Sequence, residues 1–289
     1  MSIKDIKALP IPPLPDVMLE PLVRMALLED LGRAGDLTTD TIVPADARAE
    51  LRLVARQEGV LAGIDLARIA FTLMDARTEF SPGCADGTLL QPGTEIARIR
   101  GFSRGMLSAE RTALNYLCHL SGVATATHSI AQAIAGTGAR VTCTRKTMPG
   151  LRSLQKYAVR VGGGSNHRFG LDDAVLIKDN HIALAGGIES AVARARAGVG
   201  HMVKIELEVD TLAQLEAALA LGVDVVLLDN MSLDDLRSAV AMAKGKAITE
   251  ASGRITPETA PAVAATGVDQ IAVGWLTHSA RVLDIGLDA

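Results

Sequence analysis

Residues 202–230, MVKIELEVDTLAQLEAALALGVDVVLLDN, contain one full copy of the repeat that decides the fold. A β-rich run at 202–209 is followed by a helical run at 212–221 and by a second β-rich run at 224–228. The β-rich runs do not alternate strictly between apolar and polar residues, which is typical of strands buried on both faces. Because a helix joins them through short loops, the stretch predicts two parallel strands with a helical crossover.

The same alternation recurs along the second half of the chain and predicts six strands. These are expected at 141–144, 174–177, 202–209, 224–228, 247–250 and 270–273. The helices between them are expected at 151–161, 187–197, 212–221, 233–243 and 257–266. The repeats are even, and no glycine-rich dinucleotide motif follows the first strand. The pattern therefore favours an incomplete parallel α/β barrel over an open doubly wound sheet.

The first half of the chain has a different pattern. Residues 50–104 hold short alternating runs separated by turn residues, which is typical of a small antiparallel sheet. Helical spacing predicts helices at 16–31 and 66–75, and a long helix from 109 to about 135 that Ser108 would cap.

Composition excludes several classes of protein. The chain has 289 residues, a net charge of -4 and only 2% aromatic residues, which argues against a nucleic-acid binder. The N-terminus has no apolar signal core, and no run of about 18 apolar residues is present. The three cysteines lack metal-ligand spacing. We therefore expect a soluble cytoplasmic protein without membrane segments.

One stretch, residues 144–183, is locally basic in this acidic protein, which points to a small, multiply anionic ligand. Its cationic residues are Arg145, Lys146, Arg152, Lys156, Arg160, Arg168 and Lys178, together with His167 and His181. The helical spacing of Arg152, Lys156 and Arg160 predicts a solvated helix face for these three. The others are the candidates for the ligand site, although Arg145 and Lys146 could equally form a surface loop and His167 could be an ordinary loop histidine.

Polar or small residues follow nearly every predicted strand of the barrel, and in this fold those ends meet at one mouth. They are Arg145-Lys146, Lys178, Glu206 with Glu208, Asp229, Glu250 with Ser252-Gly253, and Gly274. The basic residues suit carboxylates, Glu208 and Asp229 suit a Mg²⁺-bound polyphosphate or ribose hydroxyls, and the glycine loops suit a phosphate. Alternatively, Glu208 and Asp229 could be salt-bridge partners of the lysines.

These motifs resemble the quinolinate phosphoribosyltransferase family, whose members are also called nicotinate-nucleotide pyrophosphorylases (carboxylating). The resemblance covers nearly the whole chain in order. The matching blocks are Glu29-Asp30, Gly35–Thr39, Glu110–Asn115, Thr144–Thr147, Asn166–Arg168, Ile177–His181, Glu206–Val209, Leu227–Asn230, Glu250–Gly253, Val273-Gly274 and Leu276–Ser279.

The resemblance implies an N-terminal α/β sandwich domain at 1–118, which the C-terminal helix could also join, and a catalytic barrel at 119–289. It implies a homodimer in which Arg111 reaches the neighbour's site. It implies catalytic roles for Lys146, Lys178, Glu208 and Asp229, with the two acids near Mg²⁺ through the phosphoribosyl pyrophosphate. The implied substrate-binding residues are Arg111, Thr144, Arg145, Lys146, His167, Arg168, Lys178, Ser252, Gly253, Arg254 and Gly274.

The implied reaction joins quinolinate to phosphoribosyl pyrophosphate and gives nicotinate mononucleotide, pyrophosphate and CO₂ in NAD biosynthesis. Two residues depart from the family pattern beside the expected phosphate loops, namely Arg254 and Trp275. Two rival interpretations are a related pyrophosphorylase-like protein linked to molybdate transport and a non-enzymatic dicarboxylate sensor. A sensor would need the basic residues but neither Glu208, Asp229 nor the phosphate loops.

Overall fold

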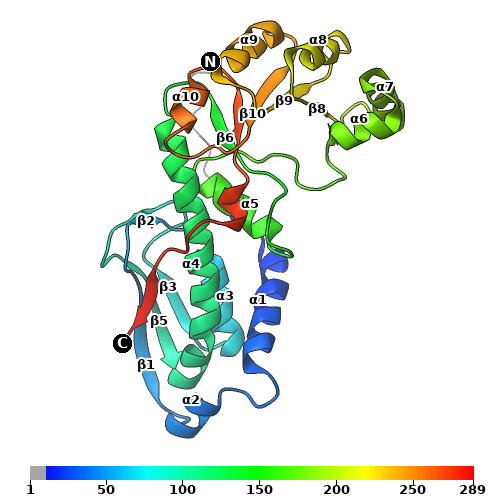
Figure 1. Cartoon of the computed structure of the whole chain (residues 1–289). Coiled ribbons are helices and arrows are strands. Elements are labelled where there is room, and N and C mark those ends of the chain that lie inside the picture. The colour runs from blue at the N-terminus through cyan, green and yellow to red at the C-terminus, as the bar shows by residue number, and fades with distance from the viewer. Residues whose placement is uncertain (1–10) are drawn as a thin grey trace, which may run out of the picture. The chain divides into compact units, whose positions relative to one another are not determined.

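The computed structural model describes residues 11–289, so the first ten residues of the predicted N-terminal domain lie outside the described part. The chain forms two compact units, and the division falls at Thr125, within the long helix α4 (Ser103–Ala133) (Figure 1). The first unit holds the described residues up to Thr125, with Arg160–Gly162 and Ala280–Ala289. The second holds Ala126–Val159 and Gly163–Ser279.

The second unit is built on a six-stranded parallel sheet in the order β6-β11-β10-β9-β8-β7. Its strands are β6 (Arg140–Thr142), β7 (Val175–Ile177), β8 (Ile205–Val209), β9 (Val225–Asp229), β10 (Ile248–Ser252) and β11 (Gln270–Ala272). The first strand pairs with the last, as in a barrel, but no strand pairing joins β6 to β7 within residues 11–289. The expected incomplete α/β barrel is confirmed, and it is open between these two strands.

Helices follow the strands as predicted. They are α5 (Arg152–Val161), α7 (Ile188–Gly198), α8 (Leu212–Ala220), α9 (Leu233–Ala243) and α10 (Ala260–Ala264). Two short helices that the pattern did not predict are α6 (Asp179–Ala185) and α11 (Trp275–His278). Helix α10 is shorter than the predicted 257–266 because the backbone N–H of Thr256 donates to the Thr259 hydroxyl, 2.9 Å away, and forms a separate turn.

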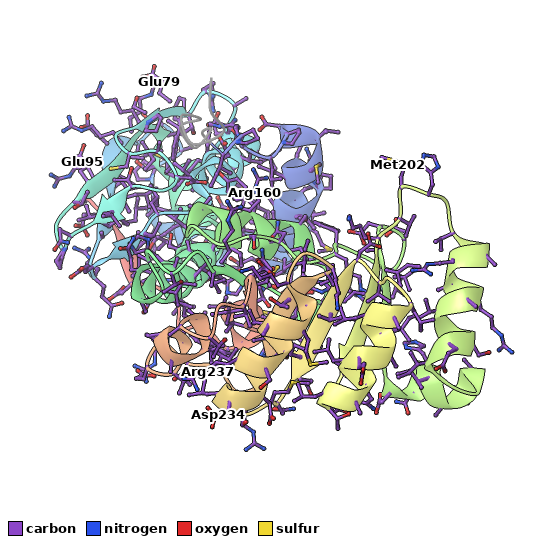
Figure 2. The ribbon with its side chains drawn as sticks, turned by 90° about the horizontal axis from the view of Figure 1, so that it is seen from above. Glu79, Glu95, Arg160, Met202, Asp234 and Arg237 are labelled. Atoms are coloured by element: carbon purple, nitrogen blue, oxygen red, sulfur yellow. The ribbon has the colours of Figure 1, made fainter. Side chains whose placement is uncertain are left out.

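Local sequence signals and core packing explain these elements. Helix α8 begins at a capping box, in which the backbone N–H of Gln214 donates to the Thr211 hydroxyl and the Gln214 side chain accepts from the Thr211 N–H. The strands contribute fully buried apolar side chains such as Leu207, Val226 and Ile271 to one core cluster. Figure 2 shows the opposite, solvent-facing side of α9, where Asp234 and Arg237 form an exposed ion pair.

The first unit contains an antiparallel sheet in the order β12-β1-β5-β3, where β1 is Arg48–Ala55, β3 is Glu79–Pro82, β5 is Glu95–Phe102 and β12 is Ile285–Asp288. A smaller pair joins β2 (Gly59–Val60) to β4 (Leu89–Leu90). The helices are α1 (Asp16–Leu31), α2 (Leu37–Ile42), α3 (Ile64–Met74) and the first part of α4. The C-terminal residues that join this unit form a strand, β12.

Strand β5 leads directly into α4, and this changes the expected start of that helix. Helix α4 begins at Ser103, so the prediction that Ser108 caps it is wrong. The Ser108 hydroxyl instead donates to Asp36 Oδ2 at 2.9 Å, and Asp36 caps α2. Farther along α4, a Cβ at Gly122 would lie 2.1 Å from the backbone oxygen of Arg281, so the C-terminal segment passes too close for any side chain there.

No helix within residues 11–289 combines the length and the apolar character needed to cross a membrane.

Candidate active site

The second unit has a pocket of about 390 Å³ at the carboxyl ends of its strands. The residues that line it are Thr144, Arg145, Lys146, His167, Arg168, Leu176, Lys178, Glu208, Leu227, Asp229, Glu250, Ser252 and Ala272. Parallel strands explain this convergence, because the segments after β6 and β7 and the last residues of β8, β9 and β10 open on the same edge. Most of the predicted site residues therefore lie together in the structure, although they are far apart in the sequence.

One part of the pocket carries positive charge that the protein leaves unbalanced. Arg145 and Arg168 each have a buried Nε without a hydrogen-bond partner in the part of the chain that the structure describes. Arg168 uses Nη1 to donate to the backbone oxygen of Ala174, 3.0 Å away. Burial and the nearby charge of Arg145 lower the pKa of Arg168. Two guanidinium groups that repel each other and keep unpaired donors form a site for an anion.

A second part of the pocket is an ion pair between Lys178 and Glu208. Lys178 follows β7 and Glu208 lies in β8, so the parallel pairing of these two strands brings the side chains together. The backbone N–H of Lys178 donates to Nδ1 of His181 at 2.9 Å, which fixes the start of α6. The alternative that Glu208 is a lysine's salt-bridge partner is thus confirmed. Both side chains still line the pocket, and Lys178 keeps 45% of its side chain exposed.

Asp229 ends β9 and accepts a hydrogen bond at 2.6 Å from the side chain of Asn230, whose φ of 51° is left-handed. The neighbouring loop after β10 meets this turn closely. Gly253 has a φ of +119°, and a Cβ there would lie 2.4 Å from Asn230 Oδ1. Only glycine therefore allows the two loops to pack against each other at the pocket edge.

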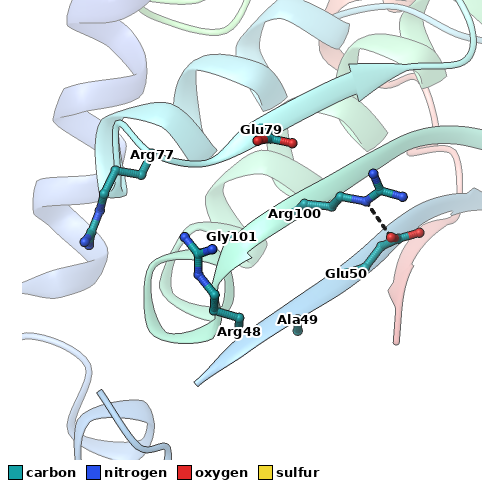
Figure 3. A pocket seen from close by; sticks show the side chains of 7 residues that line it. All are labelled: Arg48, Ala49, Glu50, Arg77, Glu79, Arg100 and Gly101. Atoms are coloured by element: carbon teal, nitrogen blue, oxygen red, sulfur yellow. Dashed lines mark hydrogen bonds and ion pairs between the residues drawn. The ribbon is translucent and has the colours of Figure 1, made fainter. Parts of the chain in front are cut away.

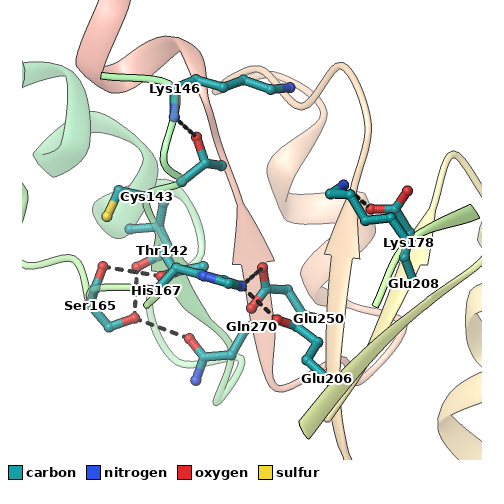
Figure 4. A network of polar contacts seen from close by, with 12 residues as sticks. Thr142, Cys143, Lys146, Ser165, His167, Lys178, Glu206, Glu208, Glu250 and Gln270 are labelled. Atoms are coloured by element: carbon teal, nitrogen blue, oxygen red, sulfur yellow. Dashed lines mark hydrogen bonds and ion pairs between the residues drawn. The ribbon is translucent and has the colours of Figure 1, made fainter. Parts of the chain in front are cut away.

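The floor of the pocket holds a buried polar cluster that Figure 4 shows from close by. Nε2 of His167 lies 2.7 Å from Glu206 Oε2 and 3.7 Å from Glu250 Oε1. Burial, reinforced by the charge of Glu206, raises the pKa of Glu250 to about 8. Burial alone would lower the pKa of His167, but the hydrogen bond to Glu206 and the charges of both acids outweigh it, so the pKa is raised.

These three side chains are also the group of His, Cys, Asp and Glu residues within 11–289 whose donor atoms converge enough for a metal ion. The 2.7 Å between Nε2 and Glu206 Oε2 is a normal length for a charge-assisted hydrogen bond, so a shared proton accounts for the contact. The cluster is therefore a different feature from Glu208 and Asp229, the pair that the sequence assigned to Mg²⁺.

Lys156 corrects one prediction from helical spacing. It was expected on a solvated helix face with Arg152 and Arg160, but its side chain is fully buried. Its Nζ donates to the backbone oxygen of His167 at 3.0 Å and to the thiol of Cys143 at 3.1 Å. Arg152 is half-buried and donates to the Thr147 hydroxyl and the Phe169 backbone oxygen. Both side chains bond to the segments that carry the pocket's cations, Lys156 from a buried position and Arg152 from a half-buried one.

Four predicted site residues are not among the pocket-lining ones. Gly253 lies beyond Ser252 at the pocket edge, and Arg254 is exposed with a left-handed φ of 50°. A Cβ on Gly274 would lie 3.1 Å from Lys146 Cδ, so Gly274 borders the lysine rather than the cavity. Arg111 is an exposed residue of α4 in the first unit.

Trp275 is the second residue that departs from the family pattern, and its side chain forms a hydrogen bond with the loop after β10. Its indole N–H donates to the backbone oxygen of Ile255 at 2.9 Å, and its ring packs against the core cluster of the second unit. The indole thus fixes the far end of the segment that begins with Ser252 and Gly253. Nothing in the structure gives Arg254 a partner within residues 11–289.

A hollow of about 400 Å³ on the first unit's antiparallel sheet is a weaker candidate (Figure 3). Its cations are already engaged: Arg100 pairs with Glu50 at 2.5 Å, and Arg77 pairs with Asp75. Arg48 and Arg77 also lie over the ring of Phe102, 4.4 and 3.9 Å from its centroid. These contacts describe a charged outer sheet surface rather than a ligand site.

Two protein-family models match the chain. Residues 36–121 match the N-terminal domain of quinolinate phosphoribosyl transferase, and residues 123–288 match its C-terminal domain. The chain belongs to the quinolinate phosphoribosyl transferase family.

Relatives of this family resemble the chain over nearly its whole length. A nicotinate-nucleotide pyrophosphorylase (carboxylating) from Mycobacterium leprae is 46% identical over 273 residues, which cover 92% of this chain and 95% of that protein. A probable nicotinate-nucleotide pyrophosphorylase (carboxylating) from Bacillus subtilis is 43% identical over 272 residues, covering 94% and 93%.

Solved structures of the family share the fold. NadC from Streptococcus pyogenes is 40% identical with a TM-score of 0.93, and the match covers 96% of this chain and 98% of that one. The nicotinate-nucleotide pyrophosphorylase from Francisella tularensis is 38% identical with a TM-score of 0.92, covering 98% and 99%.

In this member of the family, the sequence analysis placed Glu206 and Glu250 among the strand-end residues but gave them no role in the site, and it placed Lys156 on a solvated helix face. The structure places both acids inside their strands, Glu206 as the second residue of β8 and Glu250 as the middle residue of β10. The signal for Lys156 was masked, since a lysine on an amphipathic helix is ordinarily exposed.

Proposed function

We propose that this chain transfers the phosphoribosyl group of phosphoribosyl pyrophosphate to quinolinate and releases pyrophosphate and CO₂, forming nicotinate mononucleotide. The observation that carries the proposal is the pair Arg145 and Arg168, which present buried, unpaired guanidinium donors to one pocket. Quinolinate brings two carboxylates, and planar guanidinium groups bind carboxylates with two hydrogen bonds. The names of the similar proteins describe the same carboxylating pyrophosphorylase activity for those proteins.

The charge of each pocket residue indicates which part of the substrates it binds. Arg145, Arg168 and His167 bind the quinolinate carboxylates, with Lys146 at the pocket rim. Lys178 stands between this group and the acids Glu208 and Asp229. As the bond from ribose C1 to pyrophosphate breaks, positive charge develops on the ribose, and the two carboxylates stabilise it. Ser252 and the adjoining Gly253 and Gly274 loops are assigned to the phosphate.

The substrate itself accepts the electron pair that the decarboxylation releases. The quinolinate ring nitrogen forms the new bond to C1 and becomes cationic. The carboxylate on the adjacent ring carbon then leaves as CO₂, its bonding electron pair stays on that carbon, and a proton replaces the lost group. Arg145 and Arg168 hold the anion in position for both steps, and a pocket that excludes water assists the second.

A magnesium ion fits the acidic side of the pocket. Glu208 and Asp229 offer carboxylate oxygens on neighbouring strands, and Mg²⁺ is ordinarily held by one or two carboxylates together with substrate phosphates and waters. We assign both residues to hold it indirectly, through phosphoribosyl pyrophosphate. When bound, the ion neutralises charge on the leaving pyrophosphate.

We also propose that the enzyme is a cytoplasmic homodimer in which Arg111 completes the neighbour's site. Arg111 is exposed and has no ion-pair partner within residues 11–289, so its guanidinium is available to a substrate carboxylate. A mixture of two inactive variants, Arg111→Ala and Lys178→Ala, tests the shared site. Subunit exchange should restore roughly a quarter of wild-type turnover if one intact site forms in each mixed dimer, and no recovery contradicts it.

Incubation with Mg²⁺, phosphoribosyl pyrophosphate and carboxyl-labelled quinolinate tests the activity itself. We expect labelled CO₂, pyrophosphate and nicotinate mononucleotide in equal amounts. Nicotinate, which has one carboxylate, is the matched control and should release no pyrophosphate. Quinolinate binding without CO₂ release would favour the dicarboxylate sensor, and turnover of other acids in its place would favour a different pyrophosphorylase.

A further inference from the structure

Two acids, which come from two different strands, lie beside the Nε2 atom of His167. Glu206 comes from β8 and Glu250 from β10, the strands on either side of β9, and both carboxylates point at the same ring nitrogen, Nε2 (Figure 4). Both side chains are buried, with 8% and 6% of their surface exposed. The ring's other nitrogen, Nδ1, has no hydrogen-bond partner within residues 11–289.

We propose that Glu206 is a positioning residue for His167, which holds the ring by Nε2 so that the Nδ1 proton is donated to a carboxylate of quinolinate. The inference rests on the proposed function, because it concerns how that substrate is bound. It adds one residue to the site, and this residue does not need to touch the substrate.

The bonding at Nε2 explains why an acid is needed there. A ring that donates its Nε2 proton to Glu206 can also donate from Nδ1 only when both nitrogens carry protons, and the ring is then cationic. A buried cation needs a buried counter-charge. Glu206 supplies it at 2.7 Å, and the raised pKa of His167 agrees with this arrangement.

The two acids contribute differently. Glu206 Oε2 lies within hydrogen-bond distance of Nε2, whereas Glu250 Oε1 is 3.7 Å from it, and burial and the charge of Glu206 raise the pKa of Glu250. The charged groups that act on the ring are Glu206, Glu250 and Lys156 of α5, whose ammonium disfavours the protonated ring. Glu206 is thus the acid that decides the state of His167.

A pair of amide variants tests this role. Glu206→Gln keeps the shape of the side chain and removes its charge, and Glu216→Gln makes the same change at an exposed position outside the pocket. We expect Glu206→Gln to raise the KM for quinolinate roughly tenfold near neutral pH, because without the carboxylate the ring loses its proton more readily. The KM for phosphoribosyl pyrophosphate should stay within about twofold, and Glu216→Gln should leave both KM values within about twofold.

A pH profile provides the readout that a purely structural role would not change. In the wild type, the KM for quinolinate should rise as His167 loses its proton, and in Glu206→Gln that rise should occur at a lower pH. An unchanged KM and an unchanged profile in Glu206→Gln overturn the proposal. So does an equal rise of both KM values at every pH, because that pattern indicates general damage to the pocket.

Isotope-labelled histidine makes the test independent of variant folding. With six histidines in the chain, the His167 signal can be assigned by its loss in His167→Asn. In the wild-type protein with quinolinate bound near neutral pH, both ring nitrogens should carry protons, and a neutral His167 ring overturns the proposal. Wild-type enzyme that makes no nicotinate mononucleotide contradicts the proposed function, whereas normal wild-type turnover with an unaltered Glu206→Gln contradicts only this inference.

Discussion

The buried Nζ of Lys156 lies 3.0 Å from the backbone oxygen of His167, so a helix side chain fixes the loop that carries a pocket residue. The thiol of Cys143, which follows β6, is its second partner at 3.1 Å. Lysine is almost never fully buried without partners, and here both partners belong to segments that shape the same pocket.

Replacing this lysine should cost both stability and substrate binding. Lys156→Met keeps most of the side-chain volume but leaves the His167 carbonyl without its donor. We expect the free energy of unfolding to fall by about 1–3 kcal/mol, the range for one unsatisfied buried polar group, as measured by urea denaturation. The KM for quinolinate should rise at the same time. Lys246→Met, at an exposed position, is the control and should change neither.

The two unpaired arginines should dominate quinolinate affinity. Arg145→Ala or Arg168→Ala should weaken binding by about 2–5 kcal/mol, because each truncation leaves a bound carboxylate without its charged partner. Isothermal calorimetry with quinolinate measures the change directly. Arg237→Ala removes an exposed arginine whose partner is Asp234 and should leave the affinity as it was. Near-normal binding in both pocket variants would exclude these residues from the quinolinate site.

Stability should decline as the pH rises through the range in which the buried cluster holds protons. In the unfolded chain, Glu250 ionises near its ordinary value of 4.5, but in the folded protein it keeps its proton to about pH 8. Between these values the folded state binds more protons, so the free energy of unfolding falls with rising pH. His167 acts in the same direction, because its folded-state pKa is raised above 6.5.

Urea denaturation between about pH 5 and pH 9 checks the sign. Glu250→Gln cannot ionise and should make the decline shallower, while Glu216→Gln, at an exposed glutamate, should leave the slope unchanged. A steeper decline in Glu250→Gln would mean that the carboxyl is ionised in the folded protein.

The indole of Trp275 should matter for phosphoribosyl pyrophosphate rather than for quinolinate. Trp275→Phe keeps most of the ring's packing but loses the hydrogen bond to Ile255, which should lower the free energy of unfolding by about 0.5–1.5 kcal/mol. Because that bond fixes the loop after Ser252 and Gly253, the KM for phosphoribosyl pyrophosphate should rise. A larger effect on quinolinate than on phosphoribosyl pyrophosphate would argue against the assignment of this loop to the phosphate.

Much of the fold could be predicted because its signals are local. The six barrel strands appear where β-rich runs alternate with helical spacing, and α1 spans the predicted residues 16–31. The short helix α6 was missed because its start depends on a hydrogen bond from the Lys178 N–H to His181, which hydrophobic periodicity does not register. The start of α4 was misplaced because Ser108 has the right residue type for a cap but bonds to Asp36 instead.

The pocket followed from one rule, that parallel strands end at a common edge, and this placed Arg145, Lys178, Glu208 and Asp229 together. The rule could not predict the buried contacts that support the pocket residues from within the protein. Whether Lys156 faces solvent or His167 depends on how α5 packs, and the pairing of Glu206 with His167 depends on loop conformation. Such contacts depend on tertiary packing, and the hydrophobic periodicity of the sequence does not predict them.

Strand β12 closes one edge of the antiparallel sheet by pairing with β1, and Arg56, just beyond β1, forms an ion pair with Asp288 across 232 positions of sequence. During synthesis, the sheet of the N-terminal unit therefore cannot be completed until β12 has left the ribosome, and by then every strand of the barrel has already emerged. A chain that lacks β12 would leave β1 as an open edge for other chains to join.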